Sequence, residues 1–264
     1  MADETPIITE QRGPVTVITM VYKPYNLIGP TLMIPLQAAL KDAQKAGSRA
    51  IVLRSGLRHF SAGADLTLFG ARLQQGSSGT ANPDGWSRID FLKEVELLPI
   101  PIVASVHGVC LGGGVELALV CDYIIASSSA KIGSVESALG LHPLMGGIQR
   151  QVQRVGIARA KEMSMLGRRY DAATLERWGL INHVVPDEAL EKTTMTVAEE
   201  LANGPTVAHA ATKYVAYIAA NEGVRAADEA MDKLQEPIWA SEDLKTGLAS
   251  FRQNGPGLAK FKGR

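Results

Sequence analysis

The sequence lacks the features of membrane-spanning, nucleic-acid-binding and disulfide-stabilised proteins. Its 264 residues contain only two cysteines and no run of about 18 apolar residues, the length that a membrane-spanning helix needs. Lys and Arg number 27, as do Asp and Glu, so the formal net charge is zero. No global field therefore favours nucleic acid or an anionic membrane. We also find no basic stripe with interleaved aromatic residues, and expect neither kind of partner.

Metal, redox and targeting signals are also missing. Cys110 and Cys121 fit no CxxC pattern, and their apolar surroundings predict buried free thiols. The five histidines show neither HxxxH nor HExxH spacing, so no metal site is predicted. The N-terminus MADETPIITE is acidic and has no apolar signal-peptide core. We therefore expect a reduced, cytoplasmic protein.

The order of apolar patterns along the chain predicts the fold class. Strand patterns alternate with helix patterns up to about residue 140, and helix patterns dominate afterwards. We expect an α/β core over residues 1–197 and a helical region over residues 198–264. The Gly- and Ser-rich segment 70–86 is expected to be a mobile surface segment. The expected core strands are 15–21, 50–56, 101–108 and 122–127, and the expected helices between them are 31–47, 88–98 and 113–121.

The stretch HGVCLGGGVELALVCDY, residues 107–123, combines three glycines with one acid in an apolar helical segment. Glycines let backbone N–H groups approach a ligand closely, and the first N–H groups of a helix lack helical partners. Such a helix start can bind an anion, or an oxygen that becomes negative during a reaction, with Glu116 close by. The alternative is tight packing of a glycine-rich helix start, with Glu116 as a surface acid that balances the helix dipole.

Other glycine-rich devices do not fit. The triplet is not part of a GxGxxG motif, because Leu117 stands three residues after Gly114. The chain has no GxxxxGK[ST] sequence, which argues against a P-loop nucleotide site, and no GxSxG nucleophile elbow.

Two further stretches accompany the triplet, and together they resemble a known family. FSAGADL (60–66) follows a predicted strand, and GSVESALGLHPLMGGIQRQ (133–151) carries Glu136 and another Gly-Gly pair at a helix start. In this order and spacing they resemble the crotonase (enoyl-CoA hydratase/isomerase) superfamily, and the resemblance covers nearly the whole chain. It implies an α/β fold built as a spiral of ββα units, with a helical C-terminal trimerisation region. Trimers of this family often pair into hexamers.

The resemblance also implies a chemistry, in which two backbone N–H groups hold the enolate of an acyl-CoA thioester. On this chain those donors would be the N–H groups of Ala64 and Gly113. Glu116 and Glu136 stand where the hydratases keep two acids. We assign Glu116 to activating water for attack at C3 and Glu136 to protonating C2, although one shared proton could serve both. No metal or redox cofactor is implied, since coenzyme A is part of the substrate.

The resemblance leaves other activities open. A Δ3,Δ2-enoyl-CoA isomerase of this superfamily can work with one acid, and thioester or β-diketone hydrolases share the fold. A member that binds acyl-CoA without catalysis is a further alternative. Both acids favour enoyl-CoA hydratase.

Contacts to coenzyme A are implied more weakly. The two basic residues among them could equally be solvated surface charges, and the aromatic residue could be a packing residue. The matching positions are Ala62, Asp65 and Leu66 around the adenine, Lys23 and Arg58 near the phosphates, and Phe251 at the site of a neighbouring subunit.

The chain departs from the family pattern at several points. Leu66, Thr67 and Leu68 follow the GAD loop, where the hydratases have a basic residue. HPLMGG replaces the usual small residues after Glu136, and His142 is either a third titratable group or a polar loop residue. Trp86 and Phe91 either line the acyl pocket or anchor the helix that follows.

Overall fold

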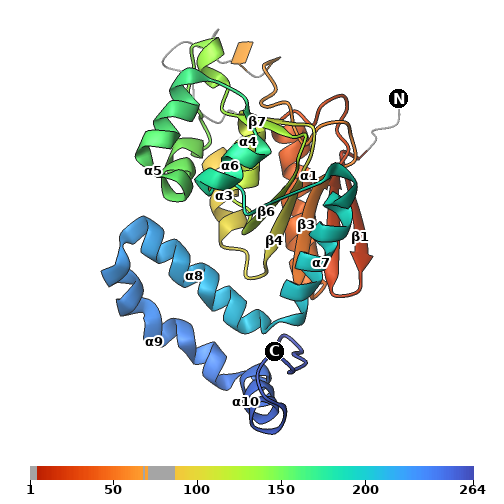
Figure 1. The fold of residues 1–264 in the computed structure, drawn as a ribbon, viewed down its shortest axis with the longest axis vertical. Coiled ribbons are helices and arrows are strands. Elements are labelled where there is room, and N and C mark those ends of the chain that lie inside the picture. Colours follow the sequence, from red (N-terminus) through yellow and green to blue (C-terminus); the bar gives the residue numbers. More distant parts are fainter. Residues whose placement is uncertain (1–4, 68, 71–86) are drawn as a thin grey trace.

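The computed structural model describes residues 5–67, 69–70 and 87–264, and its centre is a six-stranded sheet. The sheet order is β1-β2-β3-β4-β6-β9, and every neighbouring pair is parallel except β1 with β2 (Figure 1). Parallel neighbours require long crossover connections, which here contain helices. The strands are β1 (Ile7–Arg12), β2 (Val15–Met20), β3 (Ala50–Ser55), β4 (Ile102–Val106), β6 (Tyr123–Ser127) and β9 (His183–Val185).

A second, smaller sheet makes the fold a spiral. It contains β5 (Val109–Leu111), β7 (Lys131–Gly133) and β8 (Tyr170–Asp171) in the order β5-β7-β8. Consecutive strands β4 and β5 enter different sheets, as do β6 and β7, and a helical segment follows each pair. This arrangement of ββα units confirms the predicted fold.

Helices cover both faces of the large sheet. Side chains alternate along β2, so that Ile18 and Met20 join one apolar core and Val15 and Val17 join another. The first core also contains the buried residues of α1 (Pro30–Lys45), α3 (Arg88–Glu96) and α4 (Gly113–Leu119). The second core lies under α7 (Leu190–Asn203).

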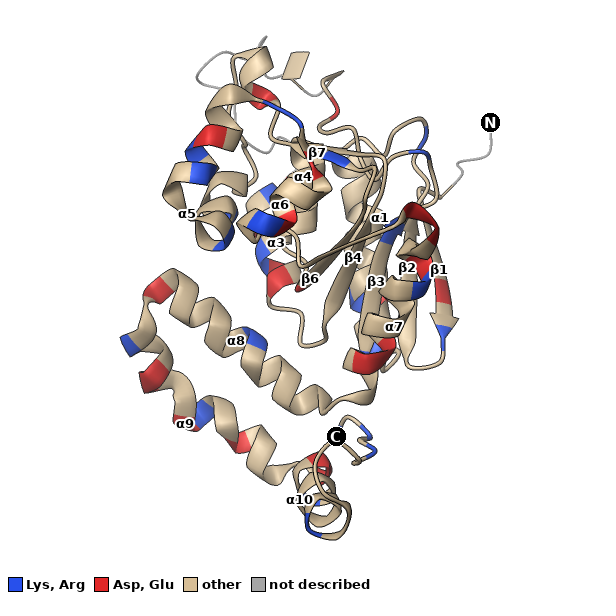
Figure 2. Cartoon of the chain, in the orientation of Figure 1, with Lys and Arg blue, Asp and Glu red and all other residues tan. Residues whose placement is uncertain are grey.

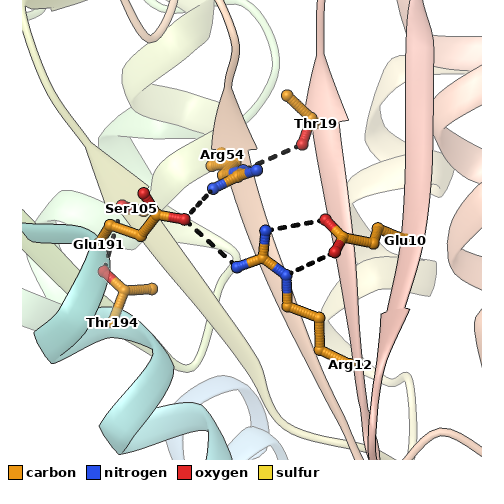
Figure 3. A network of polar contacts seen from close by, with 7 residues as sticks. All are labelled: Glu10, Arg12, Thr19, Arg54, Ser105, Glu191 and Thr194. Atoms are coloured by element: carbon orange, nitrogen blue, oxygen red, sulfur yellow. Dashed lines mark hydrogen bonds and ion pairs between the residues drawn. The ribbon is translucent and has the colours of Figure 1, made fainter.

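Polar contacts fasten α7 to the strands beneath it. Glu191, at the start of α7, accepts hydrogen bonds from Arg12 at 3.2 Å and Arg54 at 2.9 Å (Figure 3). Thr194, one turn later, donates to Ser105 of β4 at 3.1 Å. One helix is thereby held against β1, β3 and β4.

Helical segments connect the last strands of the spiral with α7. The 3-10 segment η2 (Glu136–Leu139) leads to α5 (Gly147–Leu166), which is broken at Gly156, where φ is 74°. The break divides α5 into two helical stretches. α6 (Ala172–Trp178) and η3 (Asp187–Ala189) precede α7.

Three helices form the C-terminal region, apart from the two sheets (Figure 1). They are α8 (Thr206–Glu222), α9 (Val224–Ala240) and α10 (Glu242–Asn254). α8 carries only two charged residues, and its ribbon is therefore mostly tan in Figure 2. One of the two, Lys213, donates to Asp122 at 2.7 Å and to the carbonyl of Ile100 at 3.1 Å. Lys213 thereby bonds α8 to the loops that precede β4 and β6.

The sequence predictions are largely confirmed at the level of elements. The structure has the expected core strands and helices, and both cysteines are buried and free. β1 and the short strands β5, β7, β8 and β9 are absent from the predictions. The boundary between 197 and 198 lies within α7 and stays a prediction, and residues 71–86 of the expected mobile segment lie outside the described residues. Over the described ranges, no helix has the length and apolarity needed to cross a membrane.

Arg49 also bonds the C-terminal region to the rest of the protein. Its guanidinium donates to the carbonyls of Gly204 and Phe261 and to the hydroxyl of Thr206, at 2.7, 3.0 and 3.1 Å. Arg49→Met leaves these acceptors without a donor, so we expect the free energy of unfolding in urea to fall by roughly 2 kcal/mol. Arg225→Met, which alters an arginine whose side chain is 94% exposed, is the matched control. Equal stability of the two variants would contradict the assigned role of Arg49.

Candidate active site

A cavity of about 160 Å³ brings together residues from several of the predicted motifs. Glu116 and Glu136 line it, as do Ala64 and Gly113. The rest of its wall is largely apolar and includes Ile28, Leu66, Phe69, Val135, Leu139, Leu141, Leu144 and Met145. Ile28 and Met145 lie more than a hundred positions apart in the sequence, and the spiral fold brings them to the same cavity.

Ile28 positions the loop that contains Ala64. The N–H of Ile28 donates to the carbonyl of Gly63 at 2.8 Å, and the N–H of Asp65 donates to the carbonyl of Ile28 at 3.0 Å. In this parallel bridge the N–H of Ala64 itself points away from Ile28. It has no hydrogen-bond acceptor among the described residues. The N–H of Ala64 is therefore available at the cavity wall.

The three glycines at the start of α4 are needed for close packing as well as for an available donor. Gly112 has φ of 50°, and a Cβ there would lie 3.1 Å from Oε1 of Glu136. A Cβ on Gly114 would lie 2.7 Å from Cβ of Ser61, and one on Gly113 would lie 3.2 Å from Cβ of Ile28. Within the described part of the chain, the N–H of Gly113 has no acceptor. The glycine triplet therefore allows close packing of the helix start and also leaves a backbone N–H available.

Glu116 is a buried carboxyl group held from one side. Its side chain lies in the first turn of α4, and the residue is 2% exposed. Oε1 accepts the backbone N–H groups of Met145 and Gly147, both at 2.8 Å. A Cβ on Gly147 would lie 2.7 Å from Cγ of Glu116, so this approach requires glycine. These bonds fix the carboxyl group against the wall that joins η2 to α5.

Glu136 reaches the same cavity from η2. Its Oε2 is buried and has no hydrogen-bond partner among the residues that the structure describes. Buried polar atoms of native proteins are nearly always bonded to protein or water, so this oxygen is suited to binding a ligand. The two acids thus differ, because Glu116 is anchored by the backbone, whereas Glu136 has a buried oxygen without a partner among the described residues.

Burial changes the acidity of both groups. Desolvation is the main cause that raises the pKa of Glu116 to about 7, against the lowering effect of its two N–H donors, and the charge of Glu136 raises it further. Desolvation also raises the pKa of Glu136, while a protonated His142 would lower it. Raised pKa values in two acids of one cavity favour the transfer of protons by these groups.

The predicted coenzyme A contacts divide into two groups. Ala62, Asp65 and Leu66 line the cavity. The other three predicted residues do not. Lys23 lies on a loop whose Tyr25 carbonyl accepts the N–H of Ala62 at 3.0 Å.

Arg58 and Phe251 lie elsewhere in the chain. Arg58 lines a separate, polar cavity between α7 and the sheet. Phe251 is 60% exposed on α10 and lines a groove among the C-terminal helices. Their proposed roles toward coenzyme A stay predictions.

Sequence reasoning missed several groups that shape the cavity. The anchors of Glu116 are backbone N–H groups of Met145 and Gly147, and only the close glycine pair hints at them. Arg88 lines the cavity, although no motif singles it out. His142 does not line it, and its ring lies 2.8 Å from the carbonyl of Pro143. Phe91 is buried in the core, and Trp86 lies outside the described residues.

The chain is similar to known proteins over nearly its whole length. The family model described as enoyl-CoA hydratase/isomerase matches residues 10–262. A "Probable enoyl-CoA hydratase" of Rhizobium meliloti (strain 1021) is 37% identical over 95% of this chain and 96% of that relative. "Enoyl-CoA isomerase/hydratase fer4" of Mycosarcoma maydis is 34% identical over 78% of this chain and 74% of its own. The crystal structure of an enoyl-CoA hydratase from Bacillus anthracis, 27% identical, covers 98% of this chain and 100% of its own with a TM-score of 0.86.

The match of the family model, the spiral of ββα units and the sequence motifs agree. The protein belongs to the enoyl-CoA hydratase/isomerase family and has the crotonase fold.

Proposed function

We propose that the protein is an enoyl-CoA hydratase, which adds water across the 2,3 double bond of an enoyl-CoA. The observation that carries this proposal is the convergence of two carboxyl groups and two available backbone N–H groups on one small cavity. Hydration needs donors that bind the thioester oxygen and groups that move two protons, so each of these four groups would have a role in it. The name of the Rhizobium relative supports the same activity.

The N–H groups of Ala64 and Gly113 would bind the thioester oxygen. As a nucleophile adds at C3, electron density moves onto this oxygen and gives an enolate. Donors that are fixed before the reaction stabilise this charge without reorganisation, and the loss of one such donor typically costs about 3 kcal/mol of barrier. Ile28 holds one donor through its backbone and packs against the other through its side chain, which keeps the pair in register.

The two acids would carry the protons. Glu116 in its ionised form takes one proton from water as the water oxygen bonds to C3. Glu136 in its protonated form gives one proton to C2, and the enolate collapses to the 3-hydroxyacyl product. Both groups lie on the same cavity, which supports addition to one face of the double bond. The raised pKa values support the required sharing of protons, and exchange between the two groups restores their starting states.

Coenzyme A itself is expected to extend beyond this small cavity. Ala62, Asp65 and Leu66 would contact it at the cavity, and Lys23, on the adjoining loop, would bind its phosphates. Contacts from Arg58, and from Phe251 of a neighbouring subunit, belong to the same proposal. Assembly of the protein as a trimer or a hexamer is also part of this proposal.

Double-bond migration is the second candidate activity. The relative from Mycosarcoma maydis carries both isomerase and hydratase in its name. An isomerase returns one proton to a different carbon, so a single acid suffices, and the unbonded oxygen of Glu136 would be superfluous. The pair of acids therefore favours hydration.

The test of the proposed function is the loss of conjugated enoyl-thioester absorbance from crotonyl-CoA. We expect Glu116→Gln and Glu136→Gln each to lower kcat by about 10² to 10⁴-fold, since each removes one proton-transfer group. Glu200→Gln, which changes an exposed acid of α7, is the control and should match wild type. Binding of butyryl-CoA by each variant establishes that the site is intact. Hydration that survives either substitution would refute the two-acid mechanism, and isomerisation that survives Glu136→Gln would favour the isomerase.

The burial of Glu116 should make the free energy of unfolding depend on pH. In the unfolded chain its pKa is near 4.5, whereas burial raises it to about 7 in the folded chain. The folded state therefore binds the proton more tightly, and this contribution to stability is full below pH 4.5 and lost as pH rises through 7. The amide introduced by Glu116→Gln has no such titration and can still accept the two N–H bonds. We expect the unfolding free energy of this variant, relative to wild type, to rise by about 2 to 3 kcal/mol between about pH 5 and pH 8.

Urea unfolding at a series of pH values measures this difference, and Glu200→Gln again serves as the control. Glu136 is present in both proteins, so its own titration largely cancels. A difference that stays constant with pH would mean that Glu116 keeps an ordinary pKa in the folded protein.

A further inference from the structure

Arg88 is the one cation among the described residues that line the cavity of the two acids. It is the first residue of α3, and it is half-buried. Phe91, Leu92 and Val95 are the buried residues of that helix. Their spacing from Arg88 is three, four and seven residues, so Arg88 lies on the same, inward face.

The described part of the chain offers Arg88 no partner that balances its charge. No carboxylate or other acceptor contacts its side chain within residues 5–67, 69–70 and 87–264. Arginines elsewhere are well bonded: Arg150 pairs twice with Glu96, at 2.6 and 2.7 Å, and Arg154 donates to the carbonyl of Cys121 at 2.8 Å. A half-buried guanidinium on an apolar wall is costly unless something pairs with it.

The acids of the cavity do not fill that role. Asp65 is engaged by the N–H and hydroxyl of Thr67, at 3.0 and 2.7 Å. The cation that lowers the pKa of Glu116 is Arg150, and the one that would lower that of Glu136 is His142. Neither acid of the cavity forms an ion pair or a hydrogen bond with Arg88 among the described residues.

The helix that carries Arg88 is bonded to the wall that holds Glu116. Arg150 joins Glu96 of α3 to the carbonyl of Gly146, beside the Met145 wall that holds Glu116. Lys23, by contrast, is on the loop bonded to Ala62, where coenzyme A phosphates are expected. An acyl group whose thioester is bound at Ala64 and Gly113 would share this cavity with the two acids and with Arg88.

We propose that Arg88 binds a carboxylate at the distal end of the acyl group, so that the preferred substrates are enoyl-CoA thioesters of short dicarboxylic acids. The proposal rests on the proposed hydratase function of the same cavity. Arginine forms paired hydrogen bonds with a carboxylate, which a lysine cannot reproduce. A volume of about 160 Å³ is close to that of cavities that hold a benzene molecule, which suits an acyl chain of about six carbons.

Two substrates of equal length isolate the terminal group. 2,3-Dehydroadipyl-CoA ends in a carboxylate, and 2-hexenoyl-CoA ends in a methyl group. We expect wild type to have the higher kcat/KM for the dicarboxylic substrate. Arg88→Gln should lower the ratio of the two kcat/KM values by about 10- to 100-fold, mainly through KM, and Arg88→Lys should restore it only in part.

Lys93→Gln is the matched control, because it removes one positive charge from an exposed position of the same helix. Its substrate ratio should equal that of wild type. An equal rise of KM for both substrates in Arg88→Gln would instead assign Arg88 to coenzyme A and overturn the proposal. An unchanged ratio would also overturn it.

The proposal can fail separately from the proposed function. If wild type hydrates neither substrate, the hydratase function fails, and binding of the saturated thioesters adipyl-CoA and hexanoyl-CoA by calorimetry replaces the kinetic assay. Tighter binding of adipyl-CoA that is lost in Arg88→Gln would still support carboxylate recognition. Equal binding of the two thioesters by wild type would contradict it.

Discussion

The site depends on one buried carboxyl group, that of Glu116, and on the backbone that closes around it. The N–H groups of Met145, just before α5, and of Gly147, its first residue, hold Oε1, and α5 can come so close only because residue 147 is glycine. The contact joins α4 to the segment that follows η2, so it also determines where Glu136 enters the cavity. Burial that raises the pKa of Glu116 is the direct consequence of this packing.

Ile28 has the corresponding role for the two backbone donors. Its main chain bonds on both sides of Ala64, and its side chain contacts Gly113. One residue of the β2–α1 connection therefore positions both backbone donors, although Ala64 and Gly113 lie about fifty positions apart in the sequence. The alternative readings of the glycine triplet, close packing and an available N–H, are two results of the same absence of side chains.

The sequence predicts elements best where burial imposes a clear pattern. β2 and β3 are buried along their length and are predicted, whereas β1 has mostly exposed side chains and the strands of the small sheet have two or three residues. For the site, motif resemblance identifies Glu116, Glu136, Ala64 and Gly113, which the fold does bring to one cavity. It cannot identify the anchors after η2, because any residue except proline supplies a backbone N–H. Arg88 escapes such reasoning because only the tertiary structure turns the start of α3 toward the cavity.

The cavity must combine two opposite electrostatic requirements. The acids need an apolar, cation-poor surrounding, because a nearby guanidinium would lower their pKa values and hold both in the ionised state. A charged acyl terminus needs a cation in the same cavity. The two needs are compatible if the cation occupies another part of the cavity wall than the acids, and this is the role that we propose for Arg88. The leucines of the cavity wall supply the apolar surrounding that raises the pKa values of the acids, while Arg88 supplies the charge that a carboxylate would need.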